Sequence, residues 1–440
     1  MPLYDALLSF AAEKPLRMHM PGHKGKGLPL HGLDAAALLD FTELPPTGDL
    51  FAGGGAIEAA ERLWAAAAGM EQCLFLTGGS TEGLHAALAL VCRPGDGILM
   101  DRSCHRAVYN AAALLDLRPV YLSRAWRQDV GLPGVISPET VAQAMDDHPK
   151  IKTVCITSPT YYGLLSDIPA ISEEVHRRGG KLVVDAAHGA HLFWMDEGRF
   201  LSGADLLVAS AHKTLRALGQ TAVLLANGYS HDALRSAGAL YGSSSPSYVL
   251  MASLDAARED MEQGGAGRCR AVAKRVAELR RKFPAVTEAD GPADPLRLTL
   301  LTEDGFGAQK ALQRQGVWPE MADSNHVVFI LTAADGQEEL NRLEAALKKL
   351  NSCWGFTGAG ALTLPPKPEV EYTLREALFA PKERLPLELA EGRVCACQVA
   401  PYPPGVPVIA PGEIITKKAL AYLAKVGYNM VQEIAVVADA

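Results

Sequence analysis

The stretch Asp205–Thr214, which reads DLLVASAHKT, decides how this chain is interpreted. Its apolar first half is typical of a short strand buried on both faces of a parallel sheet. Ser210, His212 and Lys213 follow that strand at once. Ligands of open α/β sheets bind beyond the carboxyl ends of the strands, so we expect these polar side chains to lie at a binding edge.

Lys213 is the most informative residue of this stretch. Lysines at the ends of elements are mostly solvated, which is the competing interpretation. Partial burial at a strand end lowers the pKa of an amine, and an amine that forms imines needs such a lowered pKa. Ser210 and His212 flank it with groups that bind phosphate. We therefore interpret Lys213 as the attachment point of an aldehyde cofactor.

The strand KLVVD, residues 181–185, closes on an acid and leads into AAHGAH. A carboxylate at the end of a buried strand is costly unless it is paired. A protonated pyridine nitrogen is one such partner, and an acid there helps the ring to accept electrons. Asp185 could equally cap a helix or shape a loop, and taken alone it does not distinguish the two.

Two further segments follow expected strands. Thr77–Gly83 (TGGSTEG) combines glycines with a helix start, which suits an anion, and Ser80 and Thr81 add hydroxyl donors. No lysine follows the glycines, so this is not a Walker loop, and a tight turn is the plainer interpretation. His105 follows the strand GILMD and is placed to stack on a cofactor ring, although a lone histidine is usually structural or solvated.

Alternation of helices and short apolar strands begins at Ala56. It predicts an α/β fold with a mostly parallel sheet in a large domain, followed by a smaller α+β domain. The expected strands lie at 73–79, 96–101, 119–123, 151–159, 181–189, 204–214, 220–227, 295–302 and 325–332. The expected helices lie at 56–68, 80–91, 106–115, 137–148, 169–179, 253–281, 336–350 and 368–379, with a last helix near the end.

Residues 1–55 are rich in glycine, proline and histidine and predict an irregular arm that must lie on something else, such as a partner subunit. We therefore expect three parts: the arm at 1–55, a cofactor-binding large domain at 56–280 and a small domain at 281–440.

Composition narrows the function classes. The chain has 440 residues, 48% of them hydrophobic, and a net charge of −8, which argues against nucleic acid or an anionic membrane as the main partner. Eight scattered cysteines indicate reduced thiols, and Cys395-x-Cys397 lacks the second pair that a zinc site needs. Without a signal peptide or an apolar run of about 20 residues, we expect a cytoplasmic protein.

Together these segments resemble the fold-type-I pyridoxal-phosphate enzymes, and more closely the Orn/Lys/Arg decarboxylase family in its short bacterial form, without an N-terminal wing domain. The resemblance covers most of the chain and is weakest between about residues 270 and 385. Its motifs, in chain order, are HMPGHKGKG, TELPPTGDL, TGGSTEGLHAAL, DRSCHRAVYNA, SPTYYGLLSDI, VVDAAHGAHLFW, SAHKTLRALGQTAVL, SSSPSY and GRVCACQVAPYPPGVPVIAPGE.

The resemblance implies a role for each site residue. Lys213 would carry pyridoxal 5′-phosphate as a Schiff base, Asp185 would pair with the pyridine nitrogen, and His105 would stack on the ring. His188 would lie beside the ring. The phosphate would be held by Ser80, Thr81, Ser210 and His212, and by Ser244 of a neighbouring subunit, which makes a homodimer the smallest active unit. The implied activity is decarboxylation of arginine, lysine or ornithine to the amine and CO2, a step in polyamine biosynthesis.

Two departures from the family pattern bear on the substrate. Many members have Glu after the pyridine-binding Asp, where this chain has Ala186, and many read Asp-Asp-Leu-His where it has Gly48–Phe51. Three acids could read the basic side chain, although each is more often a surface residue: Glu43, Asp49 and Glu413.

Other functions remain open on the sequence. An aminotransferase would need an arginine for the substrate carboxylate, for which Arg393 is the candidate. A non-catalytic homologue would have little reason to keep Lys213, Asp185, His105 and Ser80. A Rossmann dehydrogenase is excluded because no G-x-G-x-x-G follows the first strand.

Overall fold

A computed structural model describes residues 1–26, 28, 33–288, 291–357, 364–400, 407–425 and 433–438, with only the backbone for 196 and 197. The chain forms two compact units. The first comprises Met1–Val91 and Leu182–Arg270, and the second comprises Cys92–Lys181 and Ala271–Ala440.

Four strands form the centre of the first unit, in the order β1 (Gln72–Leu76), β9 (Ala222–Ala226), β8 (Leu206–Ala209) and β7 (Lys181–Asp185). β7 and β8 run parallel, whereas β9 is antiparallel to both β8 and β1. Every residue of β8 and β9 is buried, as their unbroken apolar sequences predict.

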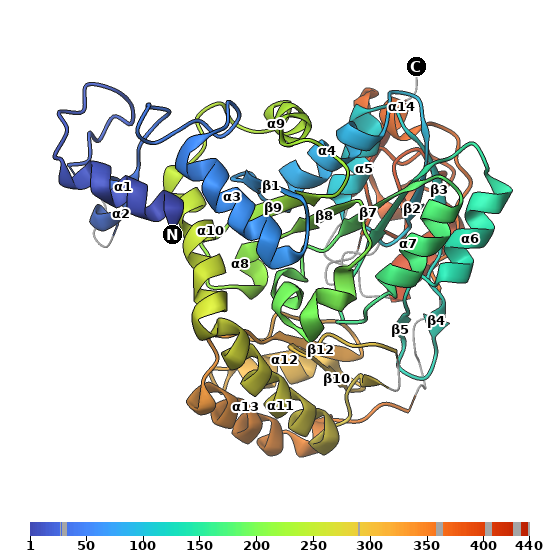
Figure 1. Cartoon of the computed structure of the whole chain (residues 1–440). Helices are drawn as coiled ribbons and strands as arrows, with labels where there is room; N and C mark the ends of the chain where they lie inside the picture. The colour runs from blue at the N-terminus through green and yellow to red at the C-terminus, as the bar shows by residue number, and fades with distance from the viewer. Residues whose placement is uncertain are drawn as a thin grey trace. The chain divides into compact units, whose positions relative to one another are not determined.

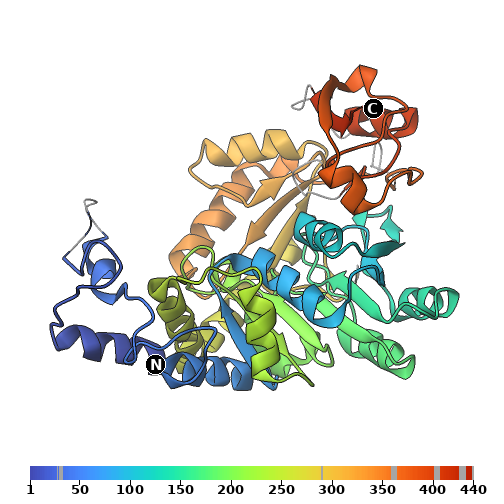
Figure 2. The same ribbon diagram turned by 90° about the horizontal axis from the view of Figure 1, so that it is seen from above.

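Helices α4 (Gly79–Val91) and α9 (His231–Ala239) lie side by side against these strands (Figures 1 and 2). Gly83 allows α4 to approach closely, because a Cβ there would stand 2.5 Å from Leu76 Cδ1 and 2.8 Å from Val208 Cγ1. α3 (Gly55–Ala68) contributes the fully buried Trp64, whose indole N–H donates to Leu254 O of α10 (Tyr248–Asp260).

The N-terminal segment is more ordered than the sequence predicted. It contains α1 (Pro2–Ala12) and α2 (Asp34–Leu39), so the expectation of a wholly irregular arm is wrong for these residues. α1 packs on α3 and α10 through Leu3 and Leu7, which lie one helical turn apart and are fully buried. Of the Gly- and Pro-rich run between the two helices, residues 27 and 29–32 lie outside the described residues.

The second unit contains three parallel strands in the order β6 (Thr153–Thr157), β2 (Gly97–Asp101) and β3 (Arg118–Leu122). The predicted cap of the helix that follows Ser137 is confirmed, because the Ser137 hydroxyl accepts the N–H of Thr140 at 3.2 Å. The helices of this part are α5 (Arg106–Leu114), α6 (Pro138–Asp147) and α7 (Ile168–Arg177). Two short strands, β4 (Trp126–Arg127) and β5 (Leu132–Pro133), form an antiparallel pair.

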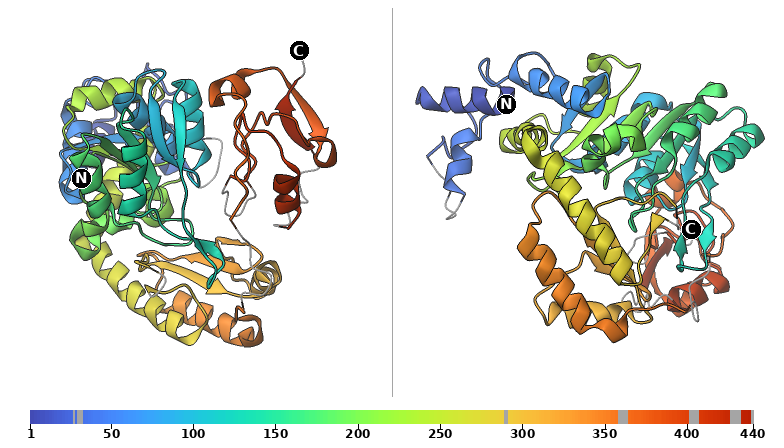
Figure 3. Two further views of the ribbon diagram at one scale, coloured as in Figure 1. Left: turned by 90° about the vertical axis from the view of Figure 1, so that its right-hand side faces the viewer. Right: turned by 60° about the horizontal axis from the view of Figure 1, so that its bottom comes forward.

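The C-terminal part of this unit is α+β. An antiparallel sheet has the order β10 (Arg297–Leu301), β12 (His326–Ile330) and β11 (Met321–Ala322). Further on, β13 (Lys382–Pro386) pairs with β14 (Glu433–Val437), as Figure 3 shows. The other elements of this part are α12 (Gly305–Gln313), α13 (Gln337–Lys349), η5 (Asn351–Cys353), α14 (Leu374–Phe379), η6 (Leu387–Leu389) and α15 (Lys417–Lys425).

The long helix expected at 253–281 is interrupted. α10 is followed by a π-helical turn (Met261–Gly265) and then by α11 (Ala266–Lys282). Gly264 has φ 138°, which glycine adopts without strain but which no helix contains, so the interruption follows from the Gly264-Gly265 pair. Glu344 of α13 accepts hydrogen bonds from Arg275 and Lys282, which joins α13 to the second half of α11.

Parallel pairing joins β7 to β8 in the first unit and β6, β2 and β3 in the second, and the predicted α/β architecture with an α+β C-terminal part is confirmed. All eight cysteines are without disulfides, and six of them are buried, as expected of core thiols. Within the described ranges, every helix is too short or too polar to serve as a transmembrane span.

Candidate active site

Asp185 and His188 lie just beyond the carboxyl end of β7. Asp185 is 2% exposed, and its Oδ1 accepts the N–H of Ala187 at 3.1 Å. The N–H of Gly189 donates to Ala186 O at 2.7 Å, so the chain turns sharply after the strand. His188, three residues after Asp185, is buried as well.

Lys213 reaches the same place from the neighbouring strand. It lies on the single turn α8 (Ala211–Thr214), which follows β8, and its side chain is half-buried. Its Nζ stands 3.2 Å from His188 Nε2. The 3₁₀-helix η1 (Ala190–Trp194) packs against α8, and a second 3₁₀-helix, η2 (Asp196–Leu201), follows it. We call Asp185, His188, Ser210 and Lys213 the β7–β8 edge.

Two hydroxyls beside Lys213 are buried. Ser210 is completely buried and Thr214 is 1% exposed, and neither side-chain oxygen has a hydrogen-bond partner among the described residues. A buried hydroxyl without a partner costs free energy, so such groups mark places where a ligand supplies the missing hydrogen bond.

The Gly-rich turn lies at the same side of the first unit. β1 is paired with β9 so that Leu76 faces Ala222, and this pairing brings the residues after β1 beside those before β9. Gly79 has φ 74° at the start of α4, and a Cβ there would stand 3.5 Å from Gln220 O. Ser80 and Thr81 occupy the first turn of α4, half-buried and exposed respectively.

His212 is oriented by the segment before β9. Its Nδ1 lies 2.8 Å from Thr221 O, which can only accept a hydrogen bond. Nδ1 therefore carries a proton, and Nε2 is the nitrogen left for another group.

Glu82 is part of the Gly-rich motif, yet nothing in the sequence distinguishes it from an ordinary surface acid. Its Oε2 accepts the N–H of Gly78 at 2.6 Å, while its Oε1 is buried without a hydrogen-bond partner among the described residues. Burial raises the pKa of Glu82 to about 7, although the Gly78 N–H opposes that shift. An acid in the first turn of a helix is so common that only the structure reveals this burial.

His105 belongs to the second unit. It is exposed and caps α5, where its Nδ1 accepts the N–H of Ala107 at 3.2 Å. The loop before it is held by two buried ion pairs. Arg124 donates to both carboxylate oxygens of Asp101, and Arg102 donates to both oxygens of Glu413.

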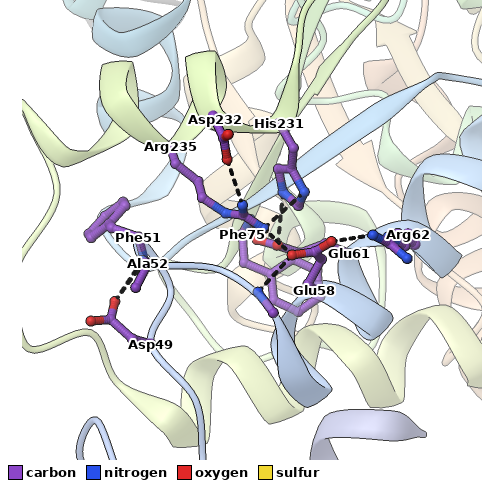
Figure 4. A network of polar contacts seen from close by, with 11 residues as sticks. Asp49, Phe51, Ala52, Glu58, Glu61, Arg62, Phe75, His231, Asp232 and Arg235 are labelled. Atoms are coloured by element: carbon purple, nitrogen blue, oxygen red, sulfur yellow. Dashed lines mark hydrogen bonds and ion pairs between the residues drawn. The ribbon is translucent and has the colours of Figure 1, made fainter.

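The loop of residues 48–54 carries one of the departures from the family pattern. Asp49 Oδ1 accepts the N–H groups of Phe51 and Ala52 at 2.8 and 3.1 Å (Figure 4). Arg235, which donates to Glu58 at 2.5 Å, lies under Gly53, where a Cβ would stand 2.3 Å from the guanidinium carbon. The loop is thus fastened at both ends.

A deeper layer of the same network anchors β1. Glu61 of α3 is 1% exposed, accepts the N–H of Phe75 at 2.8 Å and pairs with His231 at 3.0 Å (Figure 4). Arg235 Nη2 lies 3.1 Å from His231 Nδ1, so that nitrogen accepts from the guanidinium and Nε2 faces Glu61. These contacts hold α3, β1 and α9 together, and with them the Gly-rich turn that follows β1.

Phe51 and Ala186 fill small spaces. A Cβ on Gly242 would stand 2.7 Å from both Phe51 Cζ and Glu82 Oε1, so the Phe51 ring helps to bury that carboxyl group. Ala186 is fully buried and its N–H donates to Val208 O. A glutamate at position 186 would have to be buried and paired.

The three candidate acids differ in their contacts. Glu413 is neutralised by Arg102, and Asp49 shapes its own loop. Glu43 Oε1 is buried without a hydrogen-bond partner among the described residues. Arg393, the candidate carboxylate binder of an aminotransferase, donates to Glu383 at 2.5 Å and to Val437 O at 2.9 Å.

Ser244 is exposed in the loop between α9 and α10, where the Ser243 hydroxyl accepts the N–H of Ser245. Of the C-terminal signature, residues 401–406 lie outside the described residues, and so does the stretch 426–432 beyond the last helix. No group of three or more His, Cys, Asp or Glu side chains able to hold a metal occurs in the described part of the chain.

The first unit thus brings together an amine, a buried acid, an imidazole and unsatisfied hydroxyls beside a Gly-rich turn. This set suits an aldehyde cofactor that carries an anionic group and a ring nitrogen. The amine can bind the aldehyde, the acid can face a protonated nitrogen, and Ser210 can donate to the anion.

Family models match most of this chain. The Orn/Lys/Arg decarboxylase major domain matches residues 1–291, and the Orn/Lys/Arg decarboxylase C-terminal domain matches residues 366–431. The chain therefore belongs to the Orn/Lys/Arg decarboxylase family. The prediction of an amino-acid decarboxylase of this family is confirmed.

Individual relatives support the same family assignment. The uncharacterized protein YaaO of Bacillus subtilis is 32% identical, over 96% of this chain and 94% of that protein. An arginine decarboxylase of the same organism is 29% identical, over 96% of this chain and 93% of the relative. The crystal structure of the Francisella novicida lysine decarboxylase LdcF superposes with a TM-score of 0.82 at 19% identity, covering 99% of this chain and 81% of that one. This likeness confirms the predicted fold-type-I architecture.

Proposed function

We propose that this chain decarboxylates a basic amino acid with pyridoxal 5′-phosphate bound at Lys213. The observation that carries the proposal is the 3.2 Å approach of Lys213 Nζ to His188 Nε2, at an edge that also holds the buried Asp185 and Ser210. An imidazole that accepts a hydrogen bond from Lys213 keeps the amine directed toward the edge.

When bound, the cofactor supplies an electron sink for the bond that breaks at the substrate α-carbon. The residues of this chain bind and orient. Asp185 holds a proton on the ring nitrogen, and because it is buried its charge acts in a medium of low dielectric constant. Ser80, Thr81, Ser210 and His212 would hold the phosphate, and His105 would stack on the ring. Lys213 then has a second role, which is to return a proton to the α-carbon.

Loss of CO2 is favoured over transamination. An aminotransferase typically holds the substrate carboxylate with an arginine, and Arg393 is already paired with Glu383. The orientation of the bonds at the α-carbon decides which of them breaks. A substrate carboxylate that no cation holds can adopt the orientation from which CO2 is lost.

Arginine, lysine and ornithine are the proposed substrates, since the relatives include enzymes named arginine decarboxylase and lysine decarboxylase. Glu43 is proposed to bind the cationic end of the substrate side chain. It is the candidate acid that retains a buried oxygen without a partner in the described structure. Binding a cation there would satisfy that oxygen.

We further propose a cytoplasmic homodimer whose subunits share their active sites, with an arm at 1–55, a large domain at 56–280 and a small domain at 281–440. Leu16, Met18 and Met20 are 86%, 81% and 59% exposed, which is a large apolar surface to leave in water. A second copy would cover it. Ser244, exposed on its loop, is available to a partner's phosphate site.

The test is a substrate panel. Purified protein with added pyridoxal phosphate is incubated separately with arginine, lysine, ornithine and, as controls, glutamate and leucine, and products are identified by mass spectrometry. We expect one basic amino acid to yield its amine and CO2. A keto acid product would instead support an aminotransferase, and a bound yellow cofactor without any product would support a non-catalytic homologue.

A further inference from the structure

Cys395 and Cys397 lie together beside β14 in the second unit. Cys395 forms a bridge with Val436, and the N–H of Ala396 donates to Ala435 O. Both thiols are directed at that same Ala435 carbonyl, at 3.9 Å from Cys395 Sγ and 3.8 Å from Cys397 Sγ. Cys395 Sγ also lies 3.0 Å from Cys397 O, so its side chain folds toward its neighbour.

The two thiols differ in accessibility. Cys395 is fully buried in an apolar cluster with Val399, Ile409 and Val436, whereas Cys397 is partly exposed. A reagent can therefore meet Cys397 first and leave Cys395 as the inner partner.

Their electrostatic surroundings differ as well. A hydrogen bond from the Cys395 thiol, aided by the cations Lys382 and Arg384 of β13, lowers the pKa of Cys397 to about 7 against the effect of burial. At neutral pH a large share of Cys397 is thus thiolate, which is the nucleophilic form of cysteine. The same contact raises the pKa of Cys395, so that thiol keeps its proton.

The backbone permits a bond between them. Residues i and i+2 of a fully extended chain are about 6.6–7.2 Å apart at Cα, and a disulfide needs about 4.4–6.8 Å. The two sulfur atoms already share a neighbour, because Cys395 Sγ and Cys397 Sγ both lie within 3.9 Å of Ala435 O.

We propose that Cys395 and Cys397 are a redox-active thiol pair that small-molecule disulfides such as glutathione disulfide convert to an intramolecular disulfide. The Cys397 thiolate attacks one sulfur of glutathione disulfide and releases one glutathione thiolate, leaving a mixed disulfide. Cys395 then loses its proton, attacks Cys397 Sγ and displaces the second glutathione. Two protein thiols are oxidised, and one glutathione disulfide is reduced to two glutathione molecules.

Cys353 provides the internal control. It is exposed and has no second cysteine two residues away. It can form a mixed disulfide with glutathione, but nothing next to it in sequence resolves that bond.

The experiment treats the full-length protein with glutathione disulfide at pH 7 and maps its cysteines by peptide mass spectrometry. We expect the peptide with both residues to lose two hydrogens, while Cys353 retains glutathione. We also expect the alkylation rate of Cys397 by iodoacetamide to reach half its maximum near pH 7. The proposal is overturned if that peptide stays reduced, or if Cys397 retains glutathione as Cys353 does.

Variants separate the two roles. Cys395→Ser should leave the mixed disulfide on Cys397 unresolved, and Cys397→Ser should abolish the reaction at this pair. Cys353→Ser should leave the pair's oxidation unchanged. If a Cys395 variant fails to fold, the wild-type peptide map and the pH profile still decide the proposal, and neither requires decarboxylase activity.

Discussion

Two buried polar regions of this molecule are built on opposite plans. In the second unit, Tyr162, Asp323 and His326 form what we call the Asp323 cluster. Tyr162 donates to Asp323 at 2.6 Å, and His326 uses one ring nitrogen on Asp323 at 2.9 Å and the other on Val130 O at 2.7 Å. At the β7–β8 edge of the first unit, Ser210 Oγ is buried with no hydrogen-bond partner among the described residues.

The difference distinguishes buried polar groups that stabilise the fold from those that are available to bind a ligand. Both ring nitrogens of His326 face acceptors, so the imidazole is a cation paired with a carboxylate. Burial would lower the pKa of His326, but Asp323 raises it; burial would raise the pKa of Asp323, but His326 lowers it. A closed network of this kind stabilises a fold, whereas an open one is completed by something that binds.

The largest effect should come from the edge itself. Lys213→Ala should abolish the visible absorbance of the bound cofactor and reduce kcat/KM by at least about 10³-fold, because no other amine can take its place. Lys349→Ala, on the exposed face of α13, is the matched control and should leave both unchanged. Near-normal turnover of the Lys213 variant would contradict the proposed function.

The Asp323 cluster should respond in stability. Asp323→Asn leaves His326 buried without its counter-charge, so we expect a loss of about 3–5 kcal/mol in the free energy of unfolding. Urea unfolding followed by circular dichroism measures it. A loss below about 1 kcal/mol would mean that the cluster is not the closed network described above.

Ser210→Ala should weaken cofactor binding and leave the stability of the apoprotein almost unchanged. We expect the cofactor Kd to rise about tenfold or more, because a hydrogen bond to a charged phosphate is lost, with the apoprotein changing by less than about 0.5 kcal/mol. Absorbance titration and urea unfolding give the two numbers. Ser137→Ala is the control, with about 1 kcal/mol of stability lost with the α6 cap and an unchanged Kd. A destabilised apoprotein in the Ser210 variant would show that this hydroxyl supports the fold and not ligand binding.

Glu82 should show the smallest effect, and it depends on pH. Its pKa is raised in the folded protein to about 7 from an ordinary value of 4.5, so its stabilising contribution is complete below about pH 4.5 and lost as the pH rises through 7. Glu82→Gln lacks this group. The variant should therefore gain on the wild type, on the order of a kcal/mol, as urea midpoints are compared from pH 5 to pH 8. Parallel pH profiles would show that Glu82 ionises normally.

The local sequence predicted the structure well where a residue pattern is typical of a single kind of element. Unbroken apolar runs predicted the buried strands β8 and β9, and the predicted Ser137 cap is present. It was a poor guide where a partner is distant in the chain. The helix at Pro2–Ala12 was missed, because its order depends on burial against α3 and α10 and on Asp255, which accepts the N–H of Leu3.

The same limit applies to the site. The amine, the acid and the Gly-rich turn could be picked out because each directly follows an apolar strand. The sequence could not show which acids are already neutralised by an arginine. Arg102 and Glu413 are 311 residues apart, and Arg393 and Glu383 lie on different segments. Glu82 is a further case, because its burial depends on Phe51 and Gly242.

The residue pattern alone was enough to assign the family, the buried strands of the central sheets and the chemical types at the strand ends, because these follow from local periodicity and from short motifs. Which polar groups have hydrogen-bond partners and which lack them became visible only in the folded chain. Hydrogen bonding and burial are set by neighbours in space, and pairings across hundreds of residues leave no local trace in the chain.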